Sequence, residues 1–165
     1  MEIRLLNPLD AKNYLDLRLE ALQTNPEAFA SSYEEEKDQS VEKYESRFQS
    51  QDSLTFGAFE NEKLIGVVTL VVEKKKKLKH RANIFAMYVS PEKRGIGVGK
   101  NLMLEAIKKA KGLEGIEQVY LTVVTTNDLA KRLYSSLGFK KFGEDKRAIK
   151  LGNRYFDEEL MVLFF

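Results

Sequence analysis

The sequence predicts a mixed α/β protein, in which helices cover both faces of a sheet with parallel and antiparallel strands. Three observations indicate this fold class. Strand-like and helix-like segments alternate along all 165 residues. An apolar strand over residues 82–89 leads through a glycine-bearing turn directly into a helix, and a β-branched strand over residues 119–124 leads into another helix. The expected order of elements is β-α-α-β-β-β-α-β-α-β-β.

Length and composition limit the classes of function. A chain of 165 residues should form one domain, residues 1–165, with a sizeable core. The net charge of +2 is too small to indicate a nucleic-acid partner. The absence of cysteine excludes a thiolate nucleophile, so acyl transfer would have to be direct between two bound substrates. A single histidine argues against a His-rich metal site, and we expect no metal.

No targeting or membrane segment is apparent. The N-terminal residues MEIRLLNPLD lack the apolar stretch of a signal peptide. The longest nearly apolar run, residues 64–72, is far too short to cross a bilayer. We therefore expect a cytoplasmic protein with no membrane partner.

The first half of the chain should supply the first strand, two helices and a hairpin. Asp10 is placed to cap a helix that ends at Asn25-Pro26. An acidic connector then precedes a second helix, and Asn61-Glu62 joins the strands of a hairpin. In order, we expect a strand at 2–6, a helix at 10–24, the connector at 28–39, a helix at 41–50, and strands at 54–59 and 64–72.

The second half should begin with an exposed basic run, Lys74 to Arg81, which is either a solvated hairpin tip or a contact for a phosphate or an acidic partner. Gly112 and Gly138 are suited to end two helices. In order, we expect a strand at 82–89, a helix to about 111, a strand at 119–124, a helix at 127–137, and strands at 139–148 and 155–164. The apolar end, residues 160–165, is either a covered core strand or an edge strand at a homodimer interface.

The glycine-bearing turn carries the strongest chemical signal. It reads Arg94-Gly95-Ile96-Gly97-Val98-Gly99-Lys100. Amides at a helix start have no internal partners, and glycines let an anion approach them closely. The residues at 94, 100 and 101 rule out both a dinucleotide-type G-x-G-x-x-G and a P-loop. On spacing alone, a structural turn and a phosphate site both remain open.

This turn, after Met87-Tyr88-Val89-Ser90-Pro91, resembles the R/Q-x-x-G-x-G/A signature of the GCN5-related N-acetyltransferase (GNAT) superfamily, and the similarity covers nearly the whole chain. The resemblance implies the GNAT acyl-CoA N-acyltransferase fold, in which coenzyme A enters a gap between two splayed strands. The diphosphate would bind at residues 94–100, with amides of Gly95, Gly97, Val98, Gly99 and Lys100 as donors and Arg94 as an added charge. The pantetheine arm would pair with the backbone of Met87, Tyr88 and Val89.

A second motif agrees with this resemblance. The series Asn127, Ala130, Tyr134 and Gly138-Phe139 is similar to the N-x-x-A-x-x-x-Y-x-x-x-G-F pattern of many GNAT members. The resemblance implies that the asparagine contacts the coenzyme and that the Tyr134 hydroxyl protonates the leaving thiolate. On spacing alone, Tyr134 could equally be a core aromatic and Asn127 only a helix cap.

The resemblance implies acetyl-CoA-dependent acetyl transfer to a primary amine, carried by a small molecule or a peptide, in a ternary complex. No general base can be assigned, because residues 81–83 lack the glutamate that some members place there. Glu34, Glu35, Glu36 and Glu73 are candidates that would act through water. Two alternatives are a non-catalytic acyl-CoA-binding or sensor module and a partner-binding protein that docks through its basic hairpin.

The acidic connector is also a candidate for acceptor recognition. Residues 34–38 are expected where the family's first inter-helix loop walls the acceptor pocket. They would favour a cationic amine by electrostatic complementarity, or they are simply a soluble loop. The sequence leaves the identity of the amine open.

Overall fold

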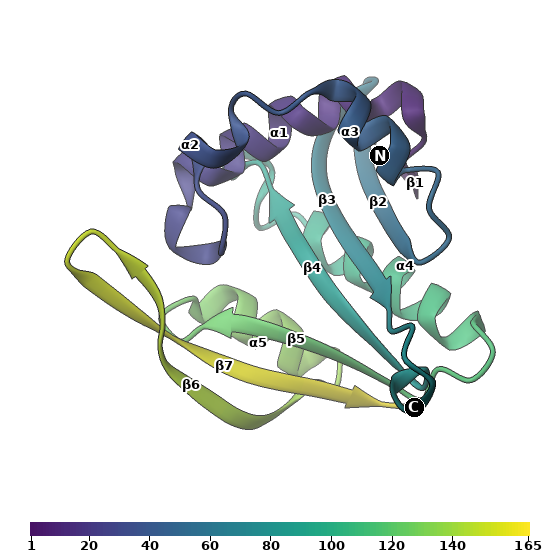
Figure 1. Ribbon diagram of the computed structural model, residues 1–165, viewed down its shortest axis with the longest axis vertical. Coiled ribbons are helices and arrows are strands. Elements are labelled where there is room, and N and C mark those ends of the chain that lie inside the picture. The colour runs from purple at the N-terminus through teal and green to yellow at the C-terminus, as the bar shows by residue number, and fades with distance from the viewer.

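The computed structural model describes residues 1–165 and contains one seven-stranded sheet in the order β1-β2-β3-β4-β5-β7-β6 (Figure 1). The strands are β1 (Glu2–Leu5), β2 (Ser53–Glu60), β3 (Lys63–Val72), β4 (Arg81–Val89), β5 (Gln118–Val124), β6 (Lys140–Leu151) and β7 (Arg154–Phe164). All neighbours pair antiparallel except β4 and β5, which are parallel. The predicted mixed sheet is confirmed.

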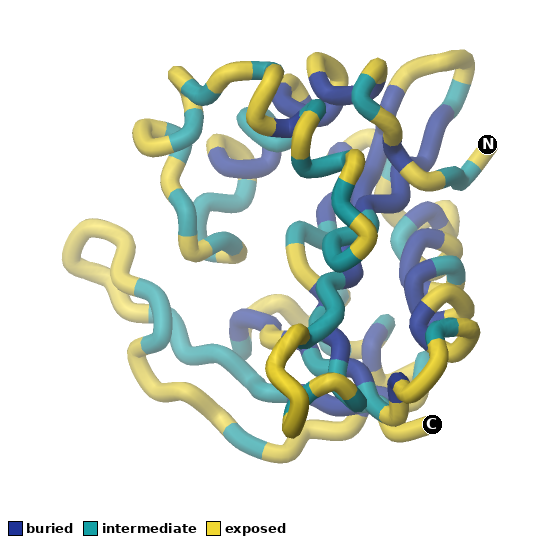
Figure 2. Tube along the Cα trace, turned by 45° about the vertical axis from the view of Figure 1, so that its right-hand side comes forward, coloured by how far each residue is buried: buried dark blue, intermediate teal, exposed yellow.

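Helices cover both faces of this sheet, as predicted (Figure 1). They are α1 (Ala11–Thr24), α2 (Tyr33–Glu36), α3 (Val41–Arg47), α4 (Val98–Gly112) and α5 (Asp128–Ser136). The larger apolar cluster joins α4 and α5 to strands of both halves of the sheet. The smaller cluster packs α1 and α3 on β2, β3 and β4. Figure 2 shows that the β6–β7 hairpin is far more exposed than the rest of the sheet.

Three expectations for the first half of the chain are wrong in detail. The acidic connector contains the extra helix α2, because Ser32 and Glu35 form a capping box that starts a helical turn. Helix α3 ends at Arg47, before the expected residue 50. Asp10 does not cap α1 with its side chain. Its carboxylate instead accepts hydrogen bonds from Arg4 at 2.7 and 2.8 Å and from the Asn7 amide at 2.8 Å.

The C-terminal apolar segment lies in an inner strand. β7 pairs with β5 on one side and with β6 on the other. The covered-strand interpretation therefore holds for residues 160–162, which pair on both sides, whereas Phe164 and Phe165 at the end of the segment are exposed.

The parallel junction between β4 and β5 is very short. Only Arg81, Ala82 and Asn83 pair with β5, opposite residues 118–120. Further along β4, the pairing with β3 shifts register and Ala86 adopts a φ of +52°. Such a bulge bends a strand and increases its twist. β4 and β5 therefore diverge beyond residue 83, and the structure has the splayed strands that the sequence predicted (Figure 1).

Candidate active site

A cleft of about 520 Å³ lies at the wide end of the gap between β4 and β5. It is lined by residues of four segments: the end of α1 and the turn after it, the end of β4, the glycine turn with the start of α4, and the end of β5 with α5. The lining residues are Asn25, Glu27, Ala28, Phe29, Met87, Tyr88, Val89, Arg94, Gly95, Gly97, Val98, Gly99, Lys100, Val124, Thr126, Asn127, Leu129, Ala130 and Leu133.

The glycine turn gives this cleft one wall rich in free amide groups. Gly95 and Gly97 have φ values of +78° and +89°, a backbone region that other residues rarely adopt. Gly97 is the N-cap residue of α4 and offers no side chain to the helix start. The first amides of α4 therefore remain available, and the helix dipole adds positive potential. This wall is suited to bind a phosphate group.

Arg94 holds the turn in place. Its Nε donates to the carbonyl oxygen of Val89 at 2.9 Å, and its Nη2 donates to Asn25 Oδ1 at 2.8 Å. The guanidinium also lies 5.4 Å from the centre of the Tyr88 ring. It forms no salt bridge within the chain, so its charge is left for an anion in the cleft. Through these contacts, the Arg94 guanidinium connects the glycine turn to β4 and to the end of α1.

The end of β4 forms a second wall. A Cβ on Gly99 would lie 2.9 Å from Met87 Cε and 3.8 Å from Val89 Cγ2, so these two side chains pack against the start of α4. The backbone of residues 87–89 pairs with β3 on one side and has no strand partner on the side of β5. The Val89 carbonyl oxygen already accepts from Arg94 Nε, so the remaining unpaired backbone groups can hydrogen-bond an extended ligand, as an added strand would.

Helix α5 forms the third wall. Asn127 is its N-cap, and its Oδ1 accepts a hydrogen bond from the Ala130 amide at 3.2 Å. Ala130 and Leu133 line the cleft. Tyr134 does not line it: the side chain is buried behind this wall, only 6% exposed, with its ring 6.1 Å from that of Phe139. Burial raises the pKa of the Tyr134 hydroxyl to about 12, so the phenol is fully protonated at neutral pH.

The structure gathers most of the predicted site residues and leaves two outside. Met87, Tyr88, Val89, Arg94, Gly95, Gly97, Val98, Gly99, Lys100, Asn127 and Ala130 all line the cleft. Ile96 is 66% exposed and, like Tyr134, is not part of the lining. The lining residues that the sequence did not indicate are Asn25, Glu27, Ala28, Phe29, Val124, Thr126, Leu129 and Leu133.

A polar cluster that the sequence did not indicate lies behind the β4 wall. Tyr88 Oη and Ser90 Oγ both donate to Glu20 Oε1, at 3.0 and 2.9 Å. Burial and the hydrogen bond to the Glu20 carboxylate raise the pKa of Tyr88. The cluster ties the end of β4 to α1, so it fixes the strand that lines the cleft.

The four carboxylates considered as bases are all engaged elsewhere. Glu36 pairs with Arg18 at 2.9 Å, Glu34 pairs with Lys37 at 2.6 Å, and Glu35 caps Ser32. Glu73 accepts a hydrogen bond from Asn83 Nδ2 at 3.0 Å. None of them lines the cleft. The basic run also lies outside it: residues 76–78 form a 3₁₀ turn, Lys74 pairs with Asp52 at 2.8 Å, and Arg81 begins β4.

Comparison with known proteins decides the family. The model of the Acetyltransferase (GNAT) family matches residues 18–139, which include the glycine turn and α5. The chain belongs to this family. No helix of the GNAT chain is both long enough and apolar enough to span a membrane.

Solved structures and curated proteins agree with this assignment. A GNAT-family acetyltransferase from Streptococcus pneumoniae is 25% identical, with 99% of each chain covered and a TM-score of 0.89. The structure of yncA from Salmonella typhimurium with its cofactor acetyl-CoA is 18% identical, covers 99% of this chain and 93% of that one, and has a TM-score of 0.86. The N-alpha-acetyltransferase RimI of Mycobacterium tuberculosis is 42% identical over 59 residues, 36% of this chain and 35% of its own. The matches span 21%, 35% and 56% of the lengths of three curated relatives.

Proposed function

We propose that this GNAT chain transfers the acetyl group of acetyl-CoA directly to a primary amine while both substrates are bound. The observation that carries the proposal is the cleft in which the glycine turn, the unpaired backbone of β4 and the start of α5 face one another. These three walls match the three parts of the donor: its diphosphate, its extended pantetheine arm and its thioester. The family relative solved with acetyl-CoA has the same fold.

The proposed binding mode assigns each wall a task. The amides of Gly95 and of residues 97–100 hydrogen-bond the diphosphate, and the Arg94 charge lies beside them. The backbone of residues 87–89 pairs with the pantetheine amides. Asn127 and Ala130 contact the donor from the side of α5. Much of the rate enhancement then comes from holding the thioester close to the amine.

The proposed reaction needs one proton donor and one proton acceptor. The amine nitrogen forms a bond to the thioester carbon, the carbon–sulfur bond breaks, and the sulfur takes up a proton. A backbone amide of β4 stabilises the negative charge that develops on the thioester oxygen. Tyr134 is the proposed proton donor to sulfur, because its phenol is protonated at neutral pH and its side chain lies one helical turn after Ala130 of the cleft lining. The amine loses its proton to water, and Glu27 is the one carboxylate among the residues that line the cleft.

Native mass spectrometry with acetyl-CoA and a pooled amine library tests this function. We expect a coenzyme adduct of the protein together with amines that have gained an acetyl group in place of a hydrogen. A coenzyme adduct without any acetylated amine across a broad pool would instead support a binding or sensor module. A protein that forms no adduct would contradict the assignment of the glycine turn.

A further inference from the structure

A second, smaller hollow of about 70 Å³ lies at the narrow end of the same gap. It is lined by Asn83, Ile84, Phe85, Tyr120, Leu121, Thr122, Phe142 and Leu160. β4 supplies Asn83–Phe85 to this hollow and Met87–Val89 to the large cleft, and β5 likewise contributes to both. The two hollows therefore follow one another along the same pair of strands. A ligand that enters the large cleft can extend into the small one.

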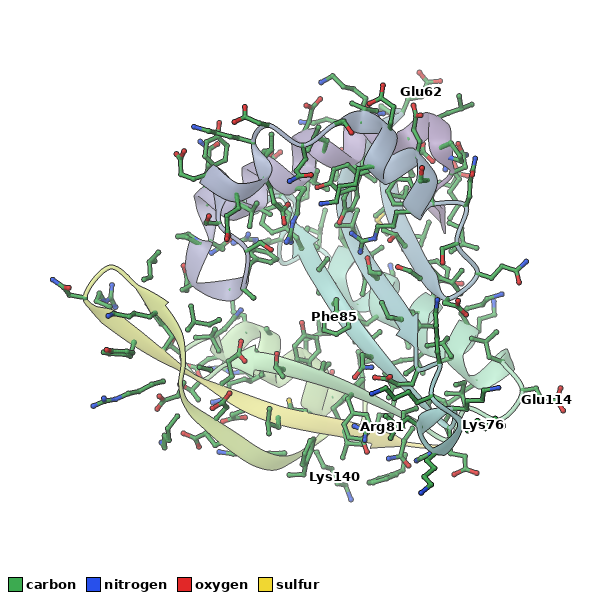
Figure 3. The ribbon with its side chains drawn as sticks, viewed as in Figure 1. Glu62, Lys76, Arg81, Phe85, Glu114 and Lys140 are labelled. Atoms are coloured by element: carbon green, nitrogen blue, oxygen red, sulfur yellow. The ribbon has the colours of Figure 1, made fainter.

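Aromatic side chains dominate the small hollow, which we call the aromatic pocket. The rings of Tyr120 and Phe142 meet edge to face with centroids 5.6 Å apart. Phe85, on the inner strand β4, and Phe142, on the edge strand β6, are each 54% exposed. In Figure 3, Phe85 points into the gap between β4 and β5. Such exposed rings in a concave site are suited to pack on an apolar ligand group.

Arg81 does not line the aromatic pocket but lies next to it, at the end where β4 and β5 pair (Figure 3). Its guanidinium carbon lies 4.0 Å from the centre of the Tyr120 ring. Its Nε is buried and has no hydrogen-bond partner, the only buried side-chain nitrogen or oxygen of the chain in that position. It also lies in no salt bridge. A buried donor without a partner is costly, and a guanidinium is the side chain best shaped to bind a carboxylate.

The opposite charge lies towards the large cleft. On β7, Glu158 lies two residues from Leu160 and so shares its face of the sheet. Glu158 is directly opposite Asp145 of β6 and pairs with Val124 of the cleft lining. The other carboxylates of this hairpin all have lysine partners: Glu144 with Lys141 and Lys146, Asp157 with Lys146, and Glu159 with Lys131 and Lys141. Glu158 and Asp145, which have no lysine partner, thus lie on the hairpin beside Val124 of the large cleft, whereas Arg81 lies beside the aromatic pocket.

We propose that the aromatic pocket and Arg81 select the acceptor: an amine that carries an aromatic or large apolar group and, beyond that group, a carboxylate. This inference rests on the proposed acetyl transfer and names the substrate class of that site. The ring of the acceptor packs on Phe85, Tyr120 and Phe142, its carboxylate accepts from the Arg81 guanidinium, and its amine points to the large cleft. The Arg81 guanidinium lies over Tyr120, which is opposite Asn83, two strand residues from Phe85. Successive strand residues are about 3.3 Å apart, so the carboxylate lies about 7 Å beyond the Phe85 level.

Matched amines test this selection. We would compare kcat/KM for 4-(2-aminoethyl)benzoate and 2-phenylethylamine, which differ only in the carboxylate. We expect the carboxylate to raise kcat/KM about tenfold or more, because it pairs with a buried charged donor. The Arg81→Gln variant should bring the ratio of the two close to one. Lys79→Gln, which removes an exposed charge outside the pocket, is the matched control and should keep the wild-type ratio.

A second pair of acceptors tests whether the natural acceptor is a peptide or a small molecule. The C-terminal amides of the dipeptides Phe-Glu and Phe-Gln differ only in the side-chain carboxylate, so they present the same question on a peptide N-terminus. A preference for Phe-Glu that exceeds the preference for the benzoate indicates a peptide acceptor, and the reverse indicates a small amino acid derivative. Either result supports the proposal. Equal kcat/KM for both members of both pairs in the wild-type protein would overturn it.

Coenzyme binding distinguishes a failure of the proposed acceptor selection from a failure of the proposed acetyl transfer. Acetylation of all these amines without any preference would overturn the selection and leave acetyl transfer standing. If no amine is acetylated, calorimetry with the coenzyme A complex decides: tighter binding of the benzoate than of 2-phenylethylamine, lost in Arg81→Gln, supports the pocket even then. Equal binding overturns it. Absence of any coenzyme binding would overturn the proposed function itself.

Discussion

The side chain of Tyr134 is part of the larger apolar cluster, and this position affects what its hydroxyl can do. Burial raises its pKa to about 12. A phenol in this state can donate a proton to a thiolate but cannot act as a base at neutral pH. The side chain lies one helical turn after Ala130, which lines the cleft.

Replacing Tyr134 tests its proposed role. Tyr134→Phe should lower kcat by about a hundredfold, the lower end of the usual contribution of a general acid. The affinity for coenzyme A should hardly change, because Tyr134 does not line the cleft. Steady-state kinetics and calorimetry measure the two quantities. Tyr155→Phe, which removes the hydroxyl of an exposed tyrosine, is the control. Wild-type kcat in Tyr134→Phe would mean that another group or water protonates the sulfur.

The same burial predicts a loss of stability at high pH. The unfolded state loses the Tyr134 proton near pH 10, whereas the folded state keeps it until about pH 12. The free energy of unfolding is therefore constant below pH 10 and falls as the pH rises from 10 to 12, by about 2–3 kcal/mol from this group. Urea unfolding at pH 9 and pH 12 measures the loss. The loss should be smaller in Tyr134→Phe, and an identical loss in both proteins would contradict the assignment.

At the scale of elements, the start of α5 combines a structural and a proposed binding role in Asn127. Asn127→Ala removes the cap that holds the Ala130 amide and should lower stability by about 1 kcal/mol. Asn127→Asp keeps a capping oxygen and should leave stability nearly unchanged. Its negative charge should still weaken coenzyme binding, since it faces the cleft. Thermal unfolding and calorimetry separate the two effects. Unchanged coenzyme affinity in Asn127→Asp would leave only the capping role.

The elements also show what the sequence can and cannot reveal. Local signals were sufficient where one residue type has one physical task, as with the glycines of the turn before α4 and the cap at Asn127. The missed helix α2 had such a signal, because Ser32 and Glu35 have capping-box spacing. The prediction for Asp10 was wrong because its carboxylate can bind either the first amides of α1 or other partners nearby. In the structure it accepts from the Arg4 side chain and the Asn7 amide instead.

The site was predictable only where a motif lies in a single segment. Phe29 and Val124 reach the cleft because distant parts of the chain fold together, and nothing in their local sequence indicates this. The cluster of Glu20, Tyr88 and Ser90 joins residues 68 and 70 positions apart. Arg81 likewise was one charge among several in the basic run. Only its buried and unpartnered Nε distinguishes it from the exposed lysines before it.

For the whole molecule, the short junction between β4 and β5 leaves the two parts of the sheet joined by few strand contacts. A ligand that contacts β4, α4 and α5 together adds a second connection between these two parts, so it should stabilise the fold. At a hundred times its Kd, acetyl-CoA should add about 2.7 kcal/mol. Hydrogen exchange should slow most at residues 84–89 and at the start of α5. Slowing confined to the glycine turn would argue against a bridging ligand.

The missing strand partner of residues 84–89 gives β4 an open edge in the interior of the sheet. Other proteins protect their sheet edges with charges, prolines or covering loops. Here Ile84, Phe85 and Met87 supply no charge, so the edge lacks the charges with which other sheets discourage pairing by an extended peptide. Acetyl-CoA that pairs with this edge would occupy it and so reduce aggregation. The solubility of the protein should accordingly follow the supply of its cofactor.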